Sequence, residues 1–260
     1  MKYVIRPEEG LVLRAFRLPA SSIRAALLEG PPGCGKTAFT QFLAQELGAS
    51  YVYHLMHSWS DDQELFMGID VASVVAGDAT NVRQLGVLAR AAELSQTGPV
   101  VVCLDELDKV QERTEYLLLD FLQSGRCPLR PGVHIQAECS RLIVCCTSNG
   151  ERPLADATLR RMRRVRMRPL DRDTVVRIVA EQTGVPASVC RMAAKLAAEE
   201  ISLQEIRSFA AEVWALAQSV QDCALLATQW LRREGEVHPS QCAALWAEIR
   251  AARQQQGVAS

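Results

Sequence analysis

The sequence lacks the cysteine pattern of a disulfide framework or a zinc site. Its nine cysteines include no C-x-x-C pair, and their odd number argues against complete pairing. Cys103, Cys145 and Cys146 fall inside apolar stretches, where cysteine behaves as a small buried hydrophobic residue. We therefore expect neither disulfide bonds nor a structural zinc ion.

Long hydrophobic runs are also missing. No apolar stretch approaches the roughly 20 residues that a membrane-spanning helix needs. The first residues, Met1–Arg6, are too few and too polar for the apolar core of a signal peptide. The expectation is a cytoplasmic protein without a membrane segment.

The chain has no large excess of charge of either sign. Its 29 Lys and Arg residues and 30 Asp and Glu residues leave a formal net charge of -1. This balance excludes a global positive field that would attract nucleic acid or an anionic membrane, although local basic patches stay open. Lysine itself is scarce and occurs only at Lys2, Lys36, Lys109 and Lys195. One of these lies in the motif described next, and another follows the acidic motif after it.

The motif that organises the chain is a phosphate-binding loop, Gly30-Pro31-Pro32-Gly33-Cys34-Gly35-Lys36-Thr37. It fits G-x-x-x-x-G-K-[ST], and it lies between an expected strand at residues 24–29 and an expected helix at residues 38–47. The glycines let backbone N–H groups turn toward a polyphosphate at the helix N-terminus. Lys36 is predicted to reach the β- and γ-phosphates, and the Thr37 hydroxyl is predicted to hold Mg²⁺.

A second stretch, residues 99–106, is an apolar run that ends in two carboxylates, Asp105 and Glu106. This pattern predicts a central parallel strand whose carboxyl end opens onto the active-site crevice. Asp105 is predicted to hold the Mg²⁺ shell, and Glu106 is predicted to polarise the attacking water. Asn149 follows another apolar run and could orient that water from the same crevice.

The chain resembles the AAA+ ATPases in four motifs that come in the order of that family. Residues 30–37 resemble Walker A, and residues 101–106 resemble Walker B with its catalytic glutamate. Residues 142–149 resemble the strand that carries the sensor-1 asparagine, Asn149. Residues 154–162 resemble the helix that ends in the arginine finger. The resemblance implies ATP and Mg²⁺ as cofactors and a homohexameric ring as the assembly.

Six arginines lie between residues 160 and 168, and three interpretations of them stay open: a solvated face, a nucleic-acid patch, or a phosphate sensor for a neighbouring subunit. We favour the third for Arg160 and Arg161, with Arg161 preferred by position, and the solvated face for the others. In the helical segment further on, Ser202 begins a predicted capping box with Glu205, and Arg207 resembles the sensor-2 arginine that touches the γ-phosphate.

Within AAA+, the details resemble the MoxR and McrB-like branch. Residues 69–85 take the place of an insert in the second helix, and residues 125–135 take the place of a hairpin before sensor 1. Phe66 and Met67, just before the first insert, have two open interpretations, as an exposed gripping element or as part of the core. GTP instead of ATP stays open in this branch.

The predicted fold is α/β, a P-loop parallel sheet flanked by helices and followed by a small helical lid. We expect the nucleotide-binding domain at residues 1–168 and the lid, with further helices, at residues 169–260. The predicted function is an ATPase that remodels a separately encoded partner protein, as a MoxR-like chaperone does. The alternative is a motor or regulatory NTPase subunit of a nucleic-acid-processing system.

Overall fold

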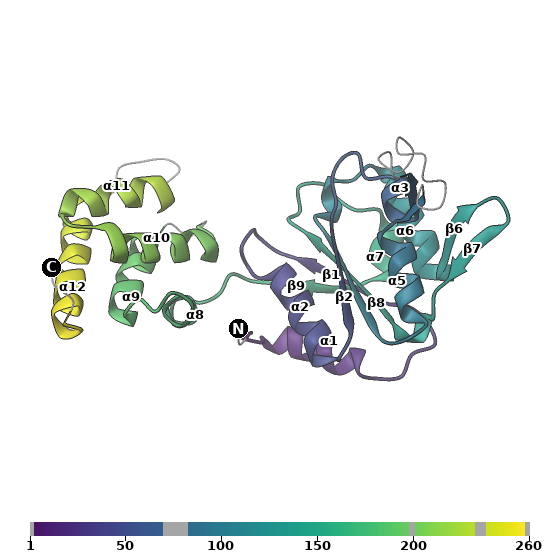
Figure 1. The fold of residues 1–260 in the computed structure, drawn as a ribbon, viewed down its shortest axis with the longest axis horizontal. Helices are drawn as coiled ribbons and strands as arrows, with labels where there is room; N and C mark the ends of the chain where they lie inside the picture. Colours follow the sequence, from purple (N-terminus) through teal and green to yellow (C-terminus); the bar gives the residue numbers. More distant parts are fainter. Residues whose placement is uncertain (1–2, 70–82, 198–200, 232–237, 258–260) are drawn as a thin grey trace. The chain divides into compact units, whose positions relative to one another are not determined.

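The computed structural model describes residues 3–69, 83–197, 201–231 and 238–257. Contacts between residues divide the chain into two compact units. One contains the segments up to residue 31 and from 35 to 167, and the other contains residues 32–34 and the chain from residue 168 onward. Figure 1 labels the helices and strands of both.

The first unit is built on a five-stranded sheet with the order β2-β5-β8-β1-β9, in which every neighbouring pair is parallel. The strands are β1 (Arg24–Glu29), β2 (Ser50–Leu55), β5 (Val100–Asp105), β8 (Leu142–Ser148) and β9 (Arg163–Arg166). Asp105 of β5 lies opposite Leu55 of β2, so the carboxyl ends of these strands meet at one edge. The predicted parallel α/β fold is confirmed.

Helices cover both faces of this sheet (Figure 1), which explains why β5 and β8 are apolar along nearly their whole length. They are α1 (Pro7–Phe16), α2 (Lys36–Glu46), α5 (Val87–Ser95), α6 (Glu112–Ser124) and α7 (Asp156–Arg161). Alternate strand residues such as Val100, Val102 and Leu104 belong to one buried cluster with α5 and α6. Because both faces are packed, the polar side chains of β5 and β8 are confined to the carboxyl ends of these two strands.

Two short segments are inserted between the elements of this core. The first comprises α3 (Asp62–Leu65), β3 (Met67–Ile69) and β4 (Arg83–Leu85), with β3 and β4 paired antiparallel. Most of the predicted insert, residues 70–82, lies outside the described residues. The second is the predicted hairpin, β6 (Arg126–Arg130) and β7 (Val133–Gln136). Short 3₁₀ turns, Leu107–Lys109 and Cys139–Arg141, precede α6 and β8.

The burial of Phe66 decides between the two interpretations of this residue, as an exposed gripping element or as part of the core. Its side chain is only 4% exposed and packs in the core cluster with Leu65 and Leu88. The core interpretation is therefore correct, and the interpretation of Phe66 as an exposed gripping element is wrong.

The second unit is helical, as predicted. It contains α8 (Arg172–Thr183), α9 (Ala187–Leu196), α10 (Leu203–Leu216), α11 (Val220–Leu231) and α12 (Pro239–Gln255) around a core that includes Val179 and Phe209. The capping box at α10 is present, since Glu205 N donates to Ser202 Oγ at 3.3 Å and Ser202 N donates to Glu205 Oε2 at 2.8 Å. None of the helices in the described ranges has the length and apolarity to cross a membrane.

Candidate functional site

The phosphate-binding loop joins β1 to α2, as its motif requires. Gly33 and Gly35 have φ values of +75° and +94°, in the left-handed region that other residues rarely adopt. α2 begins at Lys36, directly after Gly35, so the helix N-terminus faces the loop. This is the geometry that lets consecutive N–H groups and the positive end of the helix dipole bind a phosphate.

Lys36 brings the loop and the predicted sensor together. Its Nζ donates to the carbonyl oxygens of Gly30 at 2.7 Å and Pro31 at 3.0 Å, and to Oδ1 of Asn149 at 2.7 Å. Asn149 follows β8, and the loop follows the neighbouring strand β1. The fold thus brings into contact two motifs that are 113 residues apart in sequence.

Thr37 and Asp105 form the predicted metal-binding pair. The Thr37 hydroxyl donates to the Asp105 carboxylate, with distances of 3.0 Å to Oδ1 and 3.1 Å to Oδ2. Oxygen ligands of this kind, a hydroxyl beside a carboxylate, suit Mg²⁺, which prefers hard donors and retains several waters. The residues present therefore fit a magnesium ion bound together with a nucleotide.

Two further hydroxyl groups hold Asp105, and sequence reasoning missed both. Thr147 of β8 donates to Oδ1 at 2.6 Å, and Tyr53 of β2 donates to Oδ2 at 3.1 Å. Partial burial, and then the charge of Asp105, raises the pKa of Tyr53 to about 12. β2 and β8 flank β5 in the sheet, so Asp105 is held from both sides.

Glu106 has an unusual backbone. Its φ of +61° and ψ of +49° make it the one non-glycine with a positive φ among the described residues. Its amide does not continue the strand but donates to Thr147 Oγ1 at 2.9 Å. Left-handed geometry in a non-glycine residue persists where the surrounding structure enforces it, which is common at functional sites.

Asp108 supports the turn that carries the sensor and was also missed. The side chain is 3% exposed, and its Oδ2 accepts hydrogen bonds from the backbone N–H groups of Asn149 at 3.0 Å and Glu151 at 2.9 Å. The turn after β8 is therefore fixed by a residue of the turn after β5. The sequence did carry a signal for Asp108, because it is an acidic residue close after the Asp105-Glu106 pair. The residues that it contacts could not be inferred from the sequence.

A buried carboxylate also fixes the helix that carries the predicted arginine finger. Glu115 of α6 is 1% exposed and accepts from Ala155 N at 2.7 Å, Thr158 Oγ1 at 2.6 Å and Arg152 Nη2 at 2.9 Å. These groups lie at the start of α7, or just before it. The orientation of α7, and hence of the arginines at its end, is set by this buried network.

Arg160 and Arg161 end α7 and are both exposed. Arg161 donates to Ala157 O at 3.1 Å and to Gln123 Oε1 of α6 at 3.0 Å. In the same arginine run, Arg164 forms two hydrogen bonds with Glu29, at 3.0 and 2.9 Å. One arginine of the run is thus neutralised by an ion pair, whereas those at the end of α7 face solvent.

Arg207 belongs to the helical unit. It lies on α10, and its Nη1 donates to Gln182 Oε1 of α8 at 3.1 Å. Its predicted role at the γ-phosphate stays a prediction.

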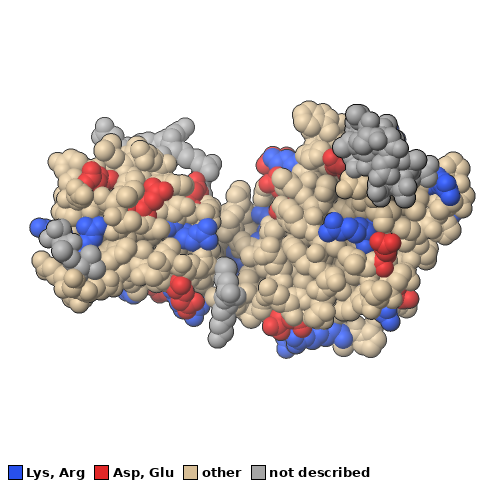
Figure 2. Space-filling view, viewed as in Figure 1, with Lys and Arg blue, Asp and Glu red and all other residues tan. Residues whose placement is uncertain are grey.

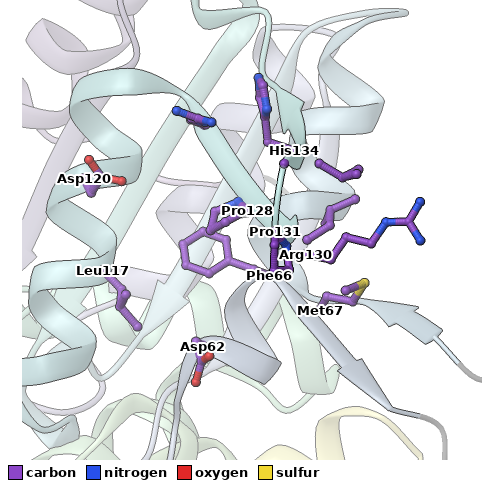
Figure 3. Close-up of a pocket in the computed structure, with 13 residues that line it drawn as sticks. Asp62, Phe66, Met67, Leu117, Asp120, Pro128, Arg130, Pro131 and His134 are labelled. Carbon is purple, nitrogen blue, oxygen red and sulfur yellow. The ribbon is translucent and has the colours of Figure 1, made fainter.

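A separate pocket of about 560 Å³ lies among α3, α6 and the β6–β7 hairpin (Figure 3). Phe66, Leu117 and Pro128 line it, together with Asp120 and Arg130. None of its lining residues belongs to the nucleotide motifs. It is therefore a feature of the hairpin surface and not of the phosphate site.

The cysteines are mostly buried in this arrangement. None of the nine, all of which lie in the described residues, forms a disulfide bond, and all except Cys139 are buried. Burial raises the pKa of the Cys103 thiol to about 11 and raises the pKa of the Cys145 and Cys146 thiols as well. Over the described ranges, no group of three or more His, Cys, Asp or Glu side chains could hold a metal ion.

The sheet, the loop at its edge and the two carboxylates at the carboxyl end of β5 define the class of P-loop nucleoside triphosphatases. Residues 25–162 match the family model "AAA domain (dynein-related subfamily)", which is more than half of the chain. The chain belongs to this family of AAA ATPases. The MoxR and McrB-like branch is a finer assignment that this match does not make.

Two curated proteins are similar to less than half of the chain. The ATP-dependent zinc metalloprotease FtsH of Hahella chejuensis is 36% identical over 97 residues, 37% of this chain and 13% of that protein. FtsH 2 of Sphaerobacter thermophilus is 35% identical over 100 residues, 38% of this chain and 13% of that protein. The chain thus matches only a small part of these relatives, and no H-E-x-x-H motif of a zinc protease occurs in its sequence.

Solved structures show the same fold at low identity. NtrX from Brucella abortus, in complex with ADP, superposes with a TM-score of 0.58 at 16% identity and covers 99% of this chain and 63% of its own. A mutant of Thermotoga maritima RuvB has a TM-score of 0.54 at 16% identity and covers 92% of this chain and 67% of its own. At such identities the comparison establishes the fold alone.

Proposed function

We propose that this protein binds and hydrolyses ATP in a ring of identical copies and uses the energy to remodel a separately encoded partner protein, in the manner of a MoxR-like chaperone. Membership of the AAA family supports the nucleotide chemistry. The hairpin of β6 and β7, which occupies the place of the hairpin before sensor 1, supports the branch. A protein is the favoured partner, because the chain has no excess of positive charge that would attract nucleic acid.

The residues take the following roles in this proposal. Lys36 binds the β- and γ-phosphates, and the loop N–H groups bind the phosphate oxygens. Thr37 and Asp105 hold Mg²⁺, which would supply charge neutralisation when bound. Glu106 polarises the attacking water, and Asn149, in contact with Lys36 at 2.7 Å, orients it.

One observation carries the assembly into a ring: Arg160 and Arg161, the two candidate finger residues, are exposed at the end of α7. Arg161 contacts Gln123 and Ala157 in its own unit, at the exposed end of α7. An exposed planar cation with five donors is suited to a phosphate presented by another molecule. A neighbouring copy supplies that phosphate, and its site is completed by Arg160 or Arg161.

The experiment is to measure ATPase rate per subunit against protein concentration, with the mass of the particles determined in parallel. We expect the specific rate to rise as particles of six copies form in the presence of nucleotide. A specific rate that stays constant while the protein remains a monomer at all concentrations would contradict the ring.

The nucleic-acid alternative rests on the arginine run alone. Arg164 is paired with Glu29, and Figure 2 shows basic and acidic side chains interspersed on the visible face. Filter binding with single- and double-stranded DNA over a salt series separates the two functions. A nucleic-acid motor gives an affinity that falls steeply with salt, because binding releases counterions, whereas the chaperone gives no such dependence.

A further inference from the structure

The hydroxyl of Thr147 links the two acidic residues at the carboxyl end of the central strand β5. The side chain is fully buried, at 0% exposed, at the end of β8. Its Oγ1 donates to Asp105 Oδ1 at 2.6 Å and accepts the backbone N–H of Glu106 at 2.9 Å. A single hydroxyl thus uses its donor on the carboxylate of one residue and an acceptor lone pair on the backbone of the next.

The second of these bonds acts on a strained residue. Glu106 lies in the left-handed region, which a non-glycine residue adopts only at an energetic cost. A residue that followed β5 in extended geometry would point its amide along the sheet ladder. Because the amide of Glu106 instead bonds Thr147, the direction in which its carboxylate leaves the backbone is fixed by β8.

We propose that Thr147 is a positioning residue that couples the magnesium-holding carboxylate of Asp105 to the water-polarising carboxylate of Glu106. It sets the rotamer of the first through its O–H group and the backbone geometry of the second through its oxygen atom. The inference rests on the proposed roles of Asp105 and Glu106. It adds a residue of the strand before Asn149 to which the motifs assign no role.

Tyr53 is the matching partner on the other side of Asp105. Its hydroxyl donates to Oδ2 at 3.1 Å from the edge strand β2, whereas Thr147 donates to Oδ1 from β8. The carboxylate is therefore held at both oxygens while Thr37 contacts it from the loop. Within the described residues, the hydrogen bond of Tyr53 goes to Asp105 and not to Glu106, so Tyr53 acts on the first carboxylate. The two residues can be separated by experiment.

Thr147→Val removes the hydroxyl at nearly constant shape, and Thr147→Ser retains it. For Thr147→Val we expect kcat to fall by about ten- to a hundredfold, as for the loss of a hydrogen bond to a charged group. The KM for ATP with Mg²⁺ should rise only by as much as the contribution of the ion to binding is lost, because the phosphate loop is untouched. Thr147→Ser should restore most of the turnover.

A binding measurement tests the magnesium side without hydrolysis. ADP affinity is measured with Mg²⁺ and with EDTA, and the ratio of the two dissociation constants gives the contribution of the ion. Thr147→Val and Tyr53→Phe should both reduce this ratio while leaving the EDTA value unchanged. Only Thr147→Val should also impair turnover at saturating Mg²⁺, since Tyr53 does not bond Glu106.

Matched controls exist in the same unit. Thr114 of α6 has a buried hydroxyl that donates to Ser60 O, away from the motifs, and Thr114→Val removes it. Tyr51→Phe removes a phenol on the same strand as Tyr53, one whose partner is Thr40 and not Asp105. Both variants should retain the magnesium ratio of the wild type.

The outcomes separate this inference from the function on which it rests. If Glu106→Gln is inactive while Thr147→Val has wild-type kcat and an unchanged magnesium ratio, Thr147 has no positioning role. If Glu106→Gln itself turns over like the wild type, the assigned roles are wrong and the inference falls with them. Equal losses in Thr147→Val and Thr147→Ser would show that packing, and not the hydroxyl, is what matters.

Discussion

Glu106→Gln is expected to bind nucleotide like the wild type and to lose nearly all turnover, whereas Lys36→Ala is expected to bind nucleotide more weakly. The glutamine keeps the size of the side chain but cannot polarise a water, and general-base catalysis contributes about a hundred- to ten-thousandfold to a rate. Lys36 is 8% exposed and donates to two loop carbonyls and Asn149. Its loss removes the cation from the phosphate cradle and should weaken ATP binding by about ten- to a hundredfold.

The measurement is the dissociation constant of a fluorescent nucleotide beside the rate of phosphate release, for each variant. Asn149→Ala should resemble Glu106→Gln, because it acts on the water and not on the cradle. Glu112→Gln, a change in an exposed carboxylate at the start of α6, is the matched control and should leave both quantities unchanged. Equal loss of ATP affinity in Lys36→Ala and Glu106→Gln would refute the division of roles.

Mixing two inactive variants is expected to restore activity. Arg161→Ala keeps its own nucleotide site but offers no finger, and Lys36→Ala keeps its finger but cannot hold nucleotide. In a mixed ring, some interfaces place an intact site against an intact arginine. A cation supplied by a neighbour is worth about three to five orders of magnitude in the best-studied GTPases, so even a few such interfaces should be measurable above the parents.

The control for this experiment is Arg166→Ala, an exposed arginine of the same run on β9, which should be fully active alone. Arg160→Ala, mixed in the same way, decides between the two candidate fingers. If mass measurements show mixed rings and the activity stays at the level of the parents, Arg161 does not act across the interface. The proposal of a finger supplied by a neighbour would then pass to Arg160.

The sequence predicted the sheet because burial on both faces leaves a continuous apolar run in each central strand. It also predicted the positions of residues, such as Asp105 and Lys36, whose place relative to a strand end is fixed by the chain itself. Asn149 was placed at the same edge for this reason, and its contact with Lys36 agrees with that placement. Patterns that are local in sequence were therefore sufficient for the fold and for the order of the motifs.

Contacts across strands could not be predicted in the same way. Thr147 and Asp108 act through partners 41 or 42 residues away, and the register of β5 against β8 decides which side chains meet. α1 was not predicted either, since Gly10 interrupts its apolar pattern and its N-cap is Arg6, which is not a usual capping residue. Phe66 shows the same limit. An apolar pair before a glycine gives the same sequence pattern whether it lies in an exposed loop or in the core.

The left-handed backbone of Glu106 has a consequence for the balance between stability and activity. Asparagine occupies this conformation more readily than glutamine or glutamate does. Glu106→Asn and Glu106→Gln both remove the charge, so a difference in their free energies of unfolding isolates the backbone strain. We expect the asparagine variant to be more stable by about 0.5–1 kcal/mol, in denaturant titrations, while both variants are inactive. Glutamate at this position thus runs against the preference of its own backbone, and with Glu106 in its proposed role a substitution that improves the fold here is expected to abolish the chemistry.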